Sequence, residues 1–403
     1  MKTIESTLEL DQRTRAVLEQ VRNLGASHLR PLGLQADRAG APLPPDHPFF
    51  EMVWRSGLAG GALAAPEEEE GGDGAPNYRH VRGCVLAEEA SYWDRGVAVS
   101  LPGPGLGGPP VQLMGTPAQR EQFLSIFRDR TGPPLWAAFA MTEPGAGSDV
   151  ARIETRCTKD GDHWVLNGTK MFSSNSKRAR WVAVFATADR AQGRAGHRAF
   201  VVESGTPGFE VIRVEKKMGV RAYETCTFVL QDCRVPAGNL LGGEEYYGER
   251  RGFKGAMASF NATRPVIAAN AVGIARAAAD IARDFIHDEY PRTGTRRALA
   301  LERMVDMRRA IERSRLLCLR AAWRLDRGEP NALESSLAKM HAPPVALRAV
   351  SMAFDILGEA GIRRDRLLEK LYRDVKVLDI VEGTQQVQRL IVARRLVGLP
   401  SQG

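Results

Sequence analysis

The chain has 403 residues, 43% of them hydrophobic, and a formal net charge of +8. A chain of this length and composition buries a substantial core and suggests two or three domains. Its basic residues are mostly arginines interspersed with acids, and no DNA- or RNA-binding motif accompanies them, so nucleic acid is not an expected partner. The positive potential can still attract a phosphate-rich ligand or an acidic protein.

The sequence gives no sign of secretion or membrane insertion. Its first ten residues, MKTIESTLEL, lack the apolar core of a signal peptide. No apolar run is long enough to span a bilayer, because the best candidate, residues 265–275, is short and contains Asn270. Scattered cysteines without a CxxC or metal-ligand spacing predict reduced core thiols and a cytoplasmic location. These cysteines are Cys84, Cys157, Cys226, Cys233 and Cys318.

Residues 1–134 are predicted to form a helical domain. Residues 10–38 and 83–92 carry apolar side chains at helical spacing. Pro- and Gly-rich stretches at 66–76 and 101–110 interrupt the helices. Four consecutive glutamates, Glu67 to Glu70, lie in the first of these stretches. Adjacent side chains on a loop point in diverging directions, so we interpret them as a solvated loop and not as a metal site.

Residues 135–245 are predicted to form a β domain. Short runs rich in β-branched and aromatic residues follow one another here, among them HWVLNG, RWVAVFAT and RAFVVES. The pair Asp160-Gly161 between two runs is a hairpin signal. Runs of this length, separated by Gly, Pro and Asp, indicate a small barrel or sandwich.

Residues 246–403 are predicted to form a helical bundle. One apolar stripe at three- and four-residue spacing is interpreted as bundle core. Its members are Leu301, Met304, Met307, Ile311, Cys318, Ala322 and Leu325. The order helical, β, helical predicts an α+β chain that ends in a bundle.

The segment Met141–Asp149, MTEPGAGSD, combines small residues with two hydroxyl groups. Glycines let the backbone approach a ligand closely, and the hydroxyls of Thr142 and Ser148 can donate hydrogen bonds to ring oxygens or phosphates. The segment contains neither GxGxxG nor GK[ST] and follows mainly helical sequence. The segment therefore gives no support to the interpretation that the chain is a nicotinamide-dependent dehydrogenase.

Four blocks of the chain, in order, resemble the acyl-CoA dehydrogenase family. Residues 140–176 resemble its flavin-binding stretch, and residues 374–396, DVKVLDIVEGTQQVQRLIVARRL, its catalytic C-terminal helix region. Residues 260–275 and 66–72 resemble its first bundle helix and an N-terminal loop. The resemblance implies an N-terminal helical domain, a middle β-barrel domain and a C-terminal four-helix bundle, usually in a homotetramer that binds FAD.

Matching residue by residue, the resemblance implies a set of ligand contacts. Phe172 takes the place of a tryptophan against the flavin ring, and Phe139 the place of a tyrosine found in several members. The implied FAD-binding residues are Phe139, Met141, Thr142, Gly147, Ser148, Phe172, Ser174, Arg292, Thr384 and Gln386. The implied substrate-binding residues are Ser148, Phe260, Arg264 and Gly383.

Glu382 matches the catalytic base of the straight-chain members. A carboxylate that the substrate buries has a raised pKa, which suits it to remove the proton α to a thioester. Hydrogen bonds to the thioester carbonyl stabilise the developing enolate. The resemblance implies that flavin N5 accepts the β-hydride and that the product is a trans-2-enoyl-CoA. The alternative interpretation is that Glu382 is merely a polar residue at a helix.

Three features depart from the family pattern. Arg292 and Gly294 are present, but the family's phenylalanine beside them is missing; Glu359 replaces a glycine in LGEAG, residues 357–361; and an extended segment, residues 242–257, precedes Phe260. An acidic side chain beside a pyrophosphate is unfavourable unless it turns outward. These departures concern the half of the FAD site shared between subunits.

The resemblance leaves alternatives open within and outside catalysis. The favoured function is α,β-dehydrogenation of an acyl-CoA by a dimer or tetramer that passes electrons to an acceptor such as electron-transferring flavoprotein. A dehydrogenase of a carrier-protein thioester is the first alternative. A non-catalytic or half-site subunit of a heteromeric enzyme is the second. The acyl group is not identified, although residues 98–111 would line its cavity by analogy.

Overall fold

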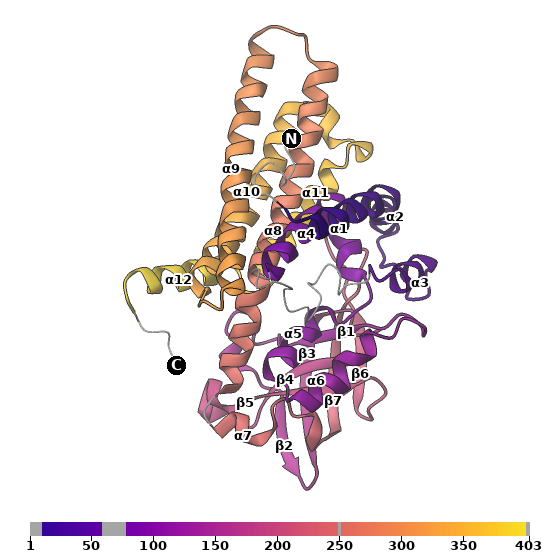
Figure 1. The fold of residues 1–403 in the computed structure, drawn as a ribbon, viewed down its shortest axis with the longest axis vertical. Coiled ribbons are helices and arrows are strands. Elements are labelled where there is room, and N and C mark those ends of the chain that lie inside the picture. The colour runs from indigo at the N-terminus through magenta and orange to yellow at the C-terminus, as the bar shows by residue number, and fades with distance from the viewer. Residues whose placement is uncertain (1–9, 59–77, 249–250, 400–403) are drawn as a thin grey trace.

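The computed structural model describes residues 10–58, 78–248 and 251–399. The predicted glutamate loop at 67–70 lies outside the described residues. Figure 1 shows a curled sheet at one end of the molecule and a long helical bundle at the other. The N-terminal helices up to residue 100 pack beside their junction, and those at 108–124 lie over the sheet. This arrangement confirms the predicted helical, β, helical fold.

The N-terminal part consists of short helices with clear end signals. Asp11 caps the first helix by accepting from the backbone N–H of Thr14, and Gly40 ends the second in a left-handed conformation. Thr116 and Gln119 form a reciprocal capping box at the last helix. The helices are α1 (Gln12–Leu24), α2 (Arg30–Ala39), α3 (Pro48–Arg55), α4 (Arg79–Ser100), α5 (Gly108–Met114) and α6 (Pro117–Leu124).

The middle part is one sheet of seven strands. Six of them follow the order β1-β4-β2-β3-β7-β6, and the seventh, β5, pairs with β4. The predicted hairpin joins β2 to β3, with Gly161 at φ 59° in its turn. Register shifts between β3 and β7 bend the sheet. The strands are β1 (Ala137–Ala140), β2 (Arg156–Asp160), β3 (His163–Ser174), β4 (Trp181–Thr187), β5 (His197–Glu203), β6 (Phe209–Val214) and β7 (Thr225–Pro236).

The C-terminal part packs three long helices and two shorter ones into a bundle. After the short α7 (Gly243–Gly248), α8 runs from the sheet to the far end of the bundle, where the chain turns into α9 (Figure 1). Met307, Ile311, Cys318 and Ala322 of the predicted stripe are buried, whereas Leu301 is 46% exposed although the adjacent Ala300 is buried. The helices are α8 (Arg251–Glu289), α9 (Thr295–Asp326), α10 (Ala332–Leu357), α11 (Leu368–Ile380) and α12 (Gln385–Leu396).

A buried charge cluster fastens α4 to the bundle. The Glu88 carboxylate accepts hydrogen bonds from Arg276 on α8 at 2.9 Å and from Arg315 on α9 at 2.7 and 2.9 Å. Arg276 also donates to Glu89 at 2.7 Å. A Cβ at Gly273 would lie 2.1 Å from the Glu88 carbonyl oxygen, so only glycine permits this approach of α4 and α8.

All five cysteines are free and buried, as predicted. Among the described residues, no group of His, Cys, Asp or Glu is arranged to hold a metal ion. One described segment, Gly255–Glu289, is long and apolar enough to cross a membrane, which is longer than the sequence run suggested. Because 83% of its most apolar window is buried in the protein, it behaves as a core helix.

Candidate active site

Glu382 lies in the short connection between α11 and α12, in a backbone conformation that the surroundings enforce. Glu382 has φ 55° and Gly383 has φ 93°. Gln388 donates to both carbonyl oxygens at 3.3 Å, Arg264 to that of Glu382 at 3.2 Å, and Lys339 to that of Gly383 at 3.4 Å. A non-glycine residue with positive φ is strained, and such strain clusters at functional sites.

The Glu382 carboxylate is half-buried and hydrogen-bonded. Thr263 on α8 donates its hydroxyl to Glu382 Oε2 at 2.6 Å. Burial raises the pKa of Glu382, and the Thr263 hydrogen bond opposes this, together with the charges of Arg264, Lys339 and Arg95. A carboxyl group with a raised pKa is a stronger base than an ordinary surface glutamate, which is the property that α-proton abstraction requires.

The turn after β1 presents the MTEPGAGSD segment. Glu143 and Ala146 exchange two backbone hydrogen bonds of 3.1 Å, and the Thr142 carbonyl accepts from the Met171 N–H at 2.9 Å. The Glu143 carboxylate accepts from the fully buried Lys170 at 2.7 Å, and Lys170 also donates to the Met141 carbonyl at 3.0 Å. Buried, satisfied charges therefore hold the turn in place.

Two aromatic residues and one hydroxyl of the predicted FAD set lie on the same part of the sheet. Phe172 has φ 59° and its side chain is 58% exposed, an unusual combination for a large aromatic residue. Ser174 is half-buried at the end of β3. Phe139 on β1 packs its ring 5.7 Å from that of Phe260 on α8, so the predicted flavin and substrate residues meet across the two domains.

The remaining predicted residues are surface residues or caps. Gly147, Ser148 and Gln386 are exposed, while Thr384 caps α12 by accepting from the Val387 N–H at 3.4 Å. Arg292 is exposed in the turn between α8 and α9, at the end of the bundle away from the sheet (Figure 1). A single chain does not bring Arg292 together with the other residues, so it contacts FAD only if a neighbouring subunit supplies it.

Sequence reasoning missed four charged residues of the site: Glu143, Lys170, Lys339 and Arg95. Glu143 stood inside the signature without a role, and Lys170 lies 27 positions further along. Lys339, on α10, is fully buried, and burial lowers its pKa to about 8. No local sequence pattern marks a lysine or arginine that becomes buried on folding. The roles of Lys339 and Arg95 are therefore seen only from their interaction with the Glu382 loop.

The helical, sheet and bundle architecture carries an exposed aromatic residue, Phe172, on its sheet and a half-buried carboxylate, Glu382, in the loop before its last helix. Family models for the acyl-CoA dehydrogenase N-terminal, middle and C-terminal domains match residues 11–127, 138–233 and 250–397. The chain belongs to the acyl-CoA dehydrogenase family.

Individual relatives agree over nearly the whole chain. The short-chain specific acyl-CoA dehydrogenase of Rattus norvegicus is 32% identical, covering 98% of this chain and 93% of the relative. Butyryl-CoA dehydrogenase from Megasphaera elsdenii is 32% identical with a TM-score of 0.85, covering 96% and 99%. A glutaryl-CoA dehydrogenase in complex with glutaryl-CoA is 26% identical with a TM-score of 0.85, covering 97% and 96%.

The cofactor of this FAD-dependent enzyme fits the residues present. The exposed ring of Phe172 offers an apolar face to a flat ring system, and side-chain hydroxyls of Thr142 and Ser174 offer donors beside it. Gly145 and Gly147 have open space around their Cα atoms, so the backbone of this turn is accessible to a ligand. The aromatic face, the hydroxyls and the accessible turn suit an isoalloxazine ring and its phosphate-bearing chain.

Proposed function

We propose that the chain removes two hydrogens from the α and β carbons of an acyl-CoA, with Glu382 as the base. The single observation that supports this best is the half-buried Glu382 carboxylate, whose pKa burial raises and which is held by Thr263, on the same helix that brings Phe260 against Phe139 of the predicted FAD set. Two of the relatives named above are a butyryl-CoA dehydrogenase and a glutaryl-CoA dehydrogenase, so the fold accommodates acyl groups with different terminal groups. Five buried free thiols support a reducing compartment such as the cytoplasm.

The reaction follows from what the chain's residues do. Glu382 takes the α-proton, and Thr263 and Arg264 keep its carboxylate and backbone in place. The Glu382 backbone N–H donates to the thioester carbonyl, which stabilises the charge that develops there. FAD, when bound, supplies the acceptor for the β-hydride. Phe139 and Phe260 form an apolar contact next to the helix turn that carries Thr263.

The proposal is tested by the visible spectrum of the purified protein. The protein should be yellow, and anaerobic addition of an accepted acyl-CoA should bleach the flavin absorbance. A panel of straight-chain, branched and carboxylate-terminated acyl-CoAs, with matching carrier-protein thioesters, separates the two thioester classes. A colourless protein that acquires FAD only with a second chain supports a heteromeric enzyme, and a yellow protein that no thioester bleaches contradicts the proposal.

We expect the functional enzyme to be a dimer or tetramer, with electron-transferring flavoprotein as the acceptor. Exposed apolar side chains line α9 and α12, and Arg292 is too far from its own chain's site to complete it. Light scattering on the FAD-bound protein should give at least twice the chain mass of 44.1 kDa. A stable, fully flavinylated monomer would contradict this expectation.

Glu359→Gly is expected to change FAD retention only modestly. Glu359 is exposed, at the end of the bundle, so its carboxylate can turn toward water and away from a pyrophosphate. The nearby Arg363 pairs with Asp365 at 2.9 Å and is not needed to neutralise Glu359. FAD stoichiometry after gel filtration checks this: an under-occupied wild type that the glycine variant restores would mean that Glu359 repels the cofactor.

A further inference from the structure

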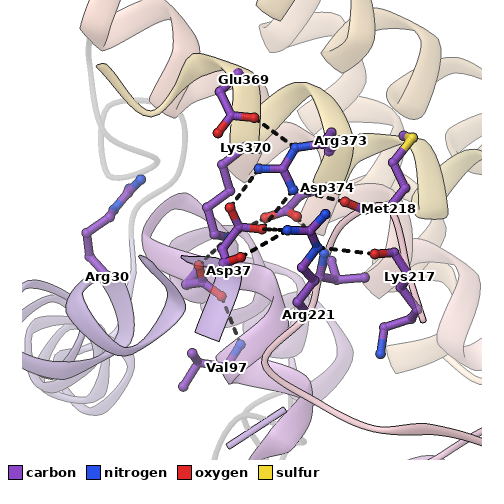
Figure 2. Close-up of polar contacts among 12 residues, drawn as sticks. Arg30, Asp37, Val97, Lys217, Met218, Arg221, Glu369, Lys370, Arg373 and Asp374 are labelled. Carbon is purple, nitrogen blue, oxygen red and sulfur yellow. Dashed lines mark hydrogen bonds and ion pairs between the residues drawn. The ribbon is translucent and has the colours of Figure 1, made fainter. Parts of the chain in front are cut away.

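Helix α11, which leads into the loop of Glu382, is held at its start by contacts with two N-terminal helices. Lys370 donates to Asp94 Oδ2 at 2.6 Å, at the point where α4 breaks with φ −162° and ψ 114°. Arg373 donates to the two carboxylate oxygens of Asp37 on α2 at 2.6 and 2.7 Å. Figure 2 shows Lys370 and Arg373 beside Asp37 at this junction. Because these groups are buried or half-buried and paired, the direction in which α11 approaches Glu382 is fixed.

The backbone of the Glu382 loop is held by donors from the bundle. Glu382 has φ 55°, and a residue with a side chain keeps this conformation only where its surroundings hold it there. Arg264 on α8 and Gln388 on α12 donate to the Glu382 carbonyl. Gln388 and Lys339 on α10 donate to the Gly383 carbonyl. A Cβ on Gly383 would lie 2.3 Å from Gln388 Nε2, so the loop packs directly against this donor. The direction of the Glu382 side chain therefore depends on these three donors.

Lys339 differs from the other buried lysines in the described part of the chain. Lys170 and Lys370 are each paired with a carboxylate, that of Glu143 at 2.7 Å and that of Asp94 at 2.6 Å. Lys339 is fully buried, yet it makes no ion pair within the described residues, and its hydrogen bond goes to a backbone carbonyl at 3.4 Å. A neutral amide could make that bond at a much smaller desolvation cost. The charge of Lys339 therefore needs a reason beyond the hydrogen bond.

The carboxylate of Glu382 supplies this reason. The negative charges that act most on Lys339 are those of Glu382 and Asp379, and Asp379 is already paired with Lys376 at 2.9 Å. The Glu382 carboxylate accepts the Thr263 hydroxyl and, like Lys339, has no ion pair among the residues that the structure describes. Opposite charges near each other and away from bulk water favour each other's charged forms.

We propose that Lys339 positions the base in two ways: its N–H holds the Gly383 carbonyl, and its charge keeps the Glu382 carboxylate ionised at neutral pH. This inference rests on the proposed dehydrogenation, because Glu382 must be ionised before it can take the α-proton. Lys339 acts through Glu382 and Gly383 and not on the substrate itself. Its role is therefore distinct from that of the residues that bind FAD or the acyl group.

The sign of the effect follows from the charges around the base. Burial raises the pKa of Glu382, and the cations Arg264, Lys339 and Arg95 oppose this. Burial lowers the pKa of Lys339 to about 8, and the charges of Glu382 and Asp379 oppose this while Arg264 adds to it, so Lys339 is cationic at neutral pH. The guanidinium groups keep their charge throughout. Loss of the Lys339 charge raises the pKa of Glu382, so the bleaching rate should reach its plateau at a higher pH.

The test measures anaerobic flavin bleaching of the FAD-bound protein at about pH 5.5 and about pH 7.5, a range in which Lys339 keeps its proton. The probe is saturating butyryl-CoA, or glutaryl-CoA where that bleaches wild type faster. Lys339→Gln removes the charge and keeps an N–H donor. It should increase the ratio of the rate at the higher pH to the rate at the lower pH by about 5-fold or more over wild type. Lys339→Met also removes the donor, so it should show the same change of ratio and a lower rate at the higher pH.

The matched control is Lys376→Met, which removes the exposed ammonium paired with Asp379 and should keep the wild-type ratio. FAD content and circular dichroism show that each variant is folded and loaded, and Lys339→Gln carries the test where the methionine variant does not fold. If Lys339→Gln loses rate equally at both pH values, or not at all, its charge does not act on the base, and the proposal is wrong while the dehydrogenation stands. If neither probe, nor any other thioester of the panel, bleaches wild type, both fail.

Discussion

Glu382→Gln is expected to slow flavin bleaching by an accepted acyl-CoA by about 10³-fold or more while FAD and substrate stay bound, because general-base catalysis contributes about 10²- to 10⁴-fold. Glutamine keeps the size of the side chain and can still accept the Thr263 hydrogen bond through its amide oxygen. The loss should therefore appear in the rate at saturating substrate and not in affinity.

Rapid-mixing absorbance under anaerobic conditions measures this step. Glu210→Gln, an equivalent change on the exposed side of β6, is the matched control and should bleach at the wild-type rate. Bleaching of Glu382→Gln within about threefold of wild type would exclude Glu382 as the base. Full retention of FAD in the variant is part of the expected result, since no carboxylate oxygen of Glu382 is assigned to the cofactor.

Glu88→Gln is expected to destabilise the protein by about 3 kcal/mol or more, because breaking a buried ion pair leaves uncompensated charge in the core. Glu88 is 1% exposed and receives three hydrogen bonds from Arg276 and Arg315, which are themselves buried. The neutral amide keeps one acceptor oxygen but directs two N–H donors toward guanidinium donors. The attachment of α4 to α8 and α9 should weaken first.

Thermal and urea unfolding of the FAD-loaded protein measure the effect as a fall in apparent midpoint. The control is Glu51→Gln, which removes an exposed pair with Arg55 of 2.9 Å and should cost about 0.5 kcal/mol or less. A midpoint for Glu88→Gln as high as that of the control would mean that the cluster contributes specificity of packing and not stability.

Much of the architecture could be predicted from local sequence. Apolar spacing along α1 and α9, the alternating run along β3 and the continuous apolar run along β4 depend only on neighbours a few positions apart, which is why local sequence reveals them. The Asp160-Gly161 turn is equally local. The predicted burial of Leu301 was wrong, because periodicity marks an apolar face without saying which element covers it.

The candidate site also has a part that local sequence predicts and a part that it does not. The sequence by itself determined the family and located the proposed base, Glu382, and the flavin-type turn, because each lies within a contiguous signature. Only the tertiary structure decided that the charges of Lys339 and Arg95 act on Glu382, since these residues come from α10 and α4. The break at Asp94 depends on Lys370, 276 positions away. Asp94 and Lys370 are paired because a buried ion needs an opposite charge. Such a partner is distant in sequence, so only the folded chain brings the two together.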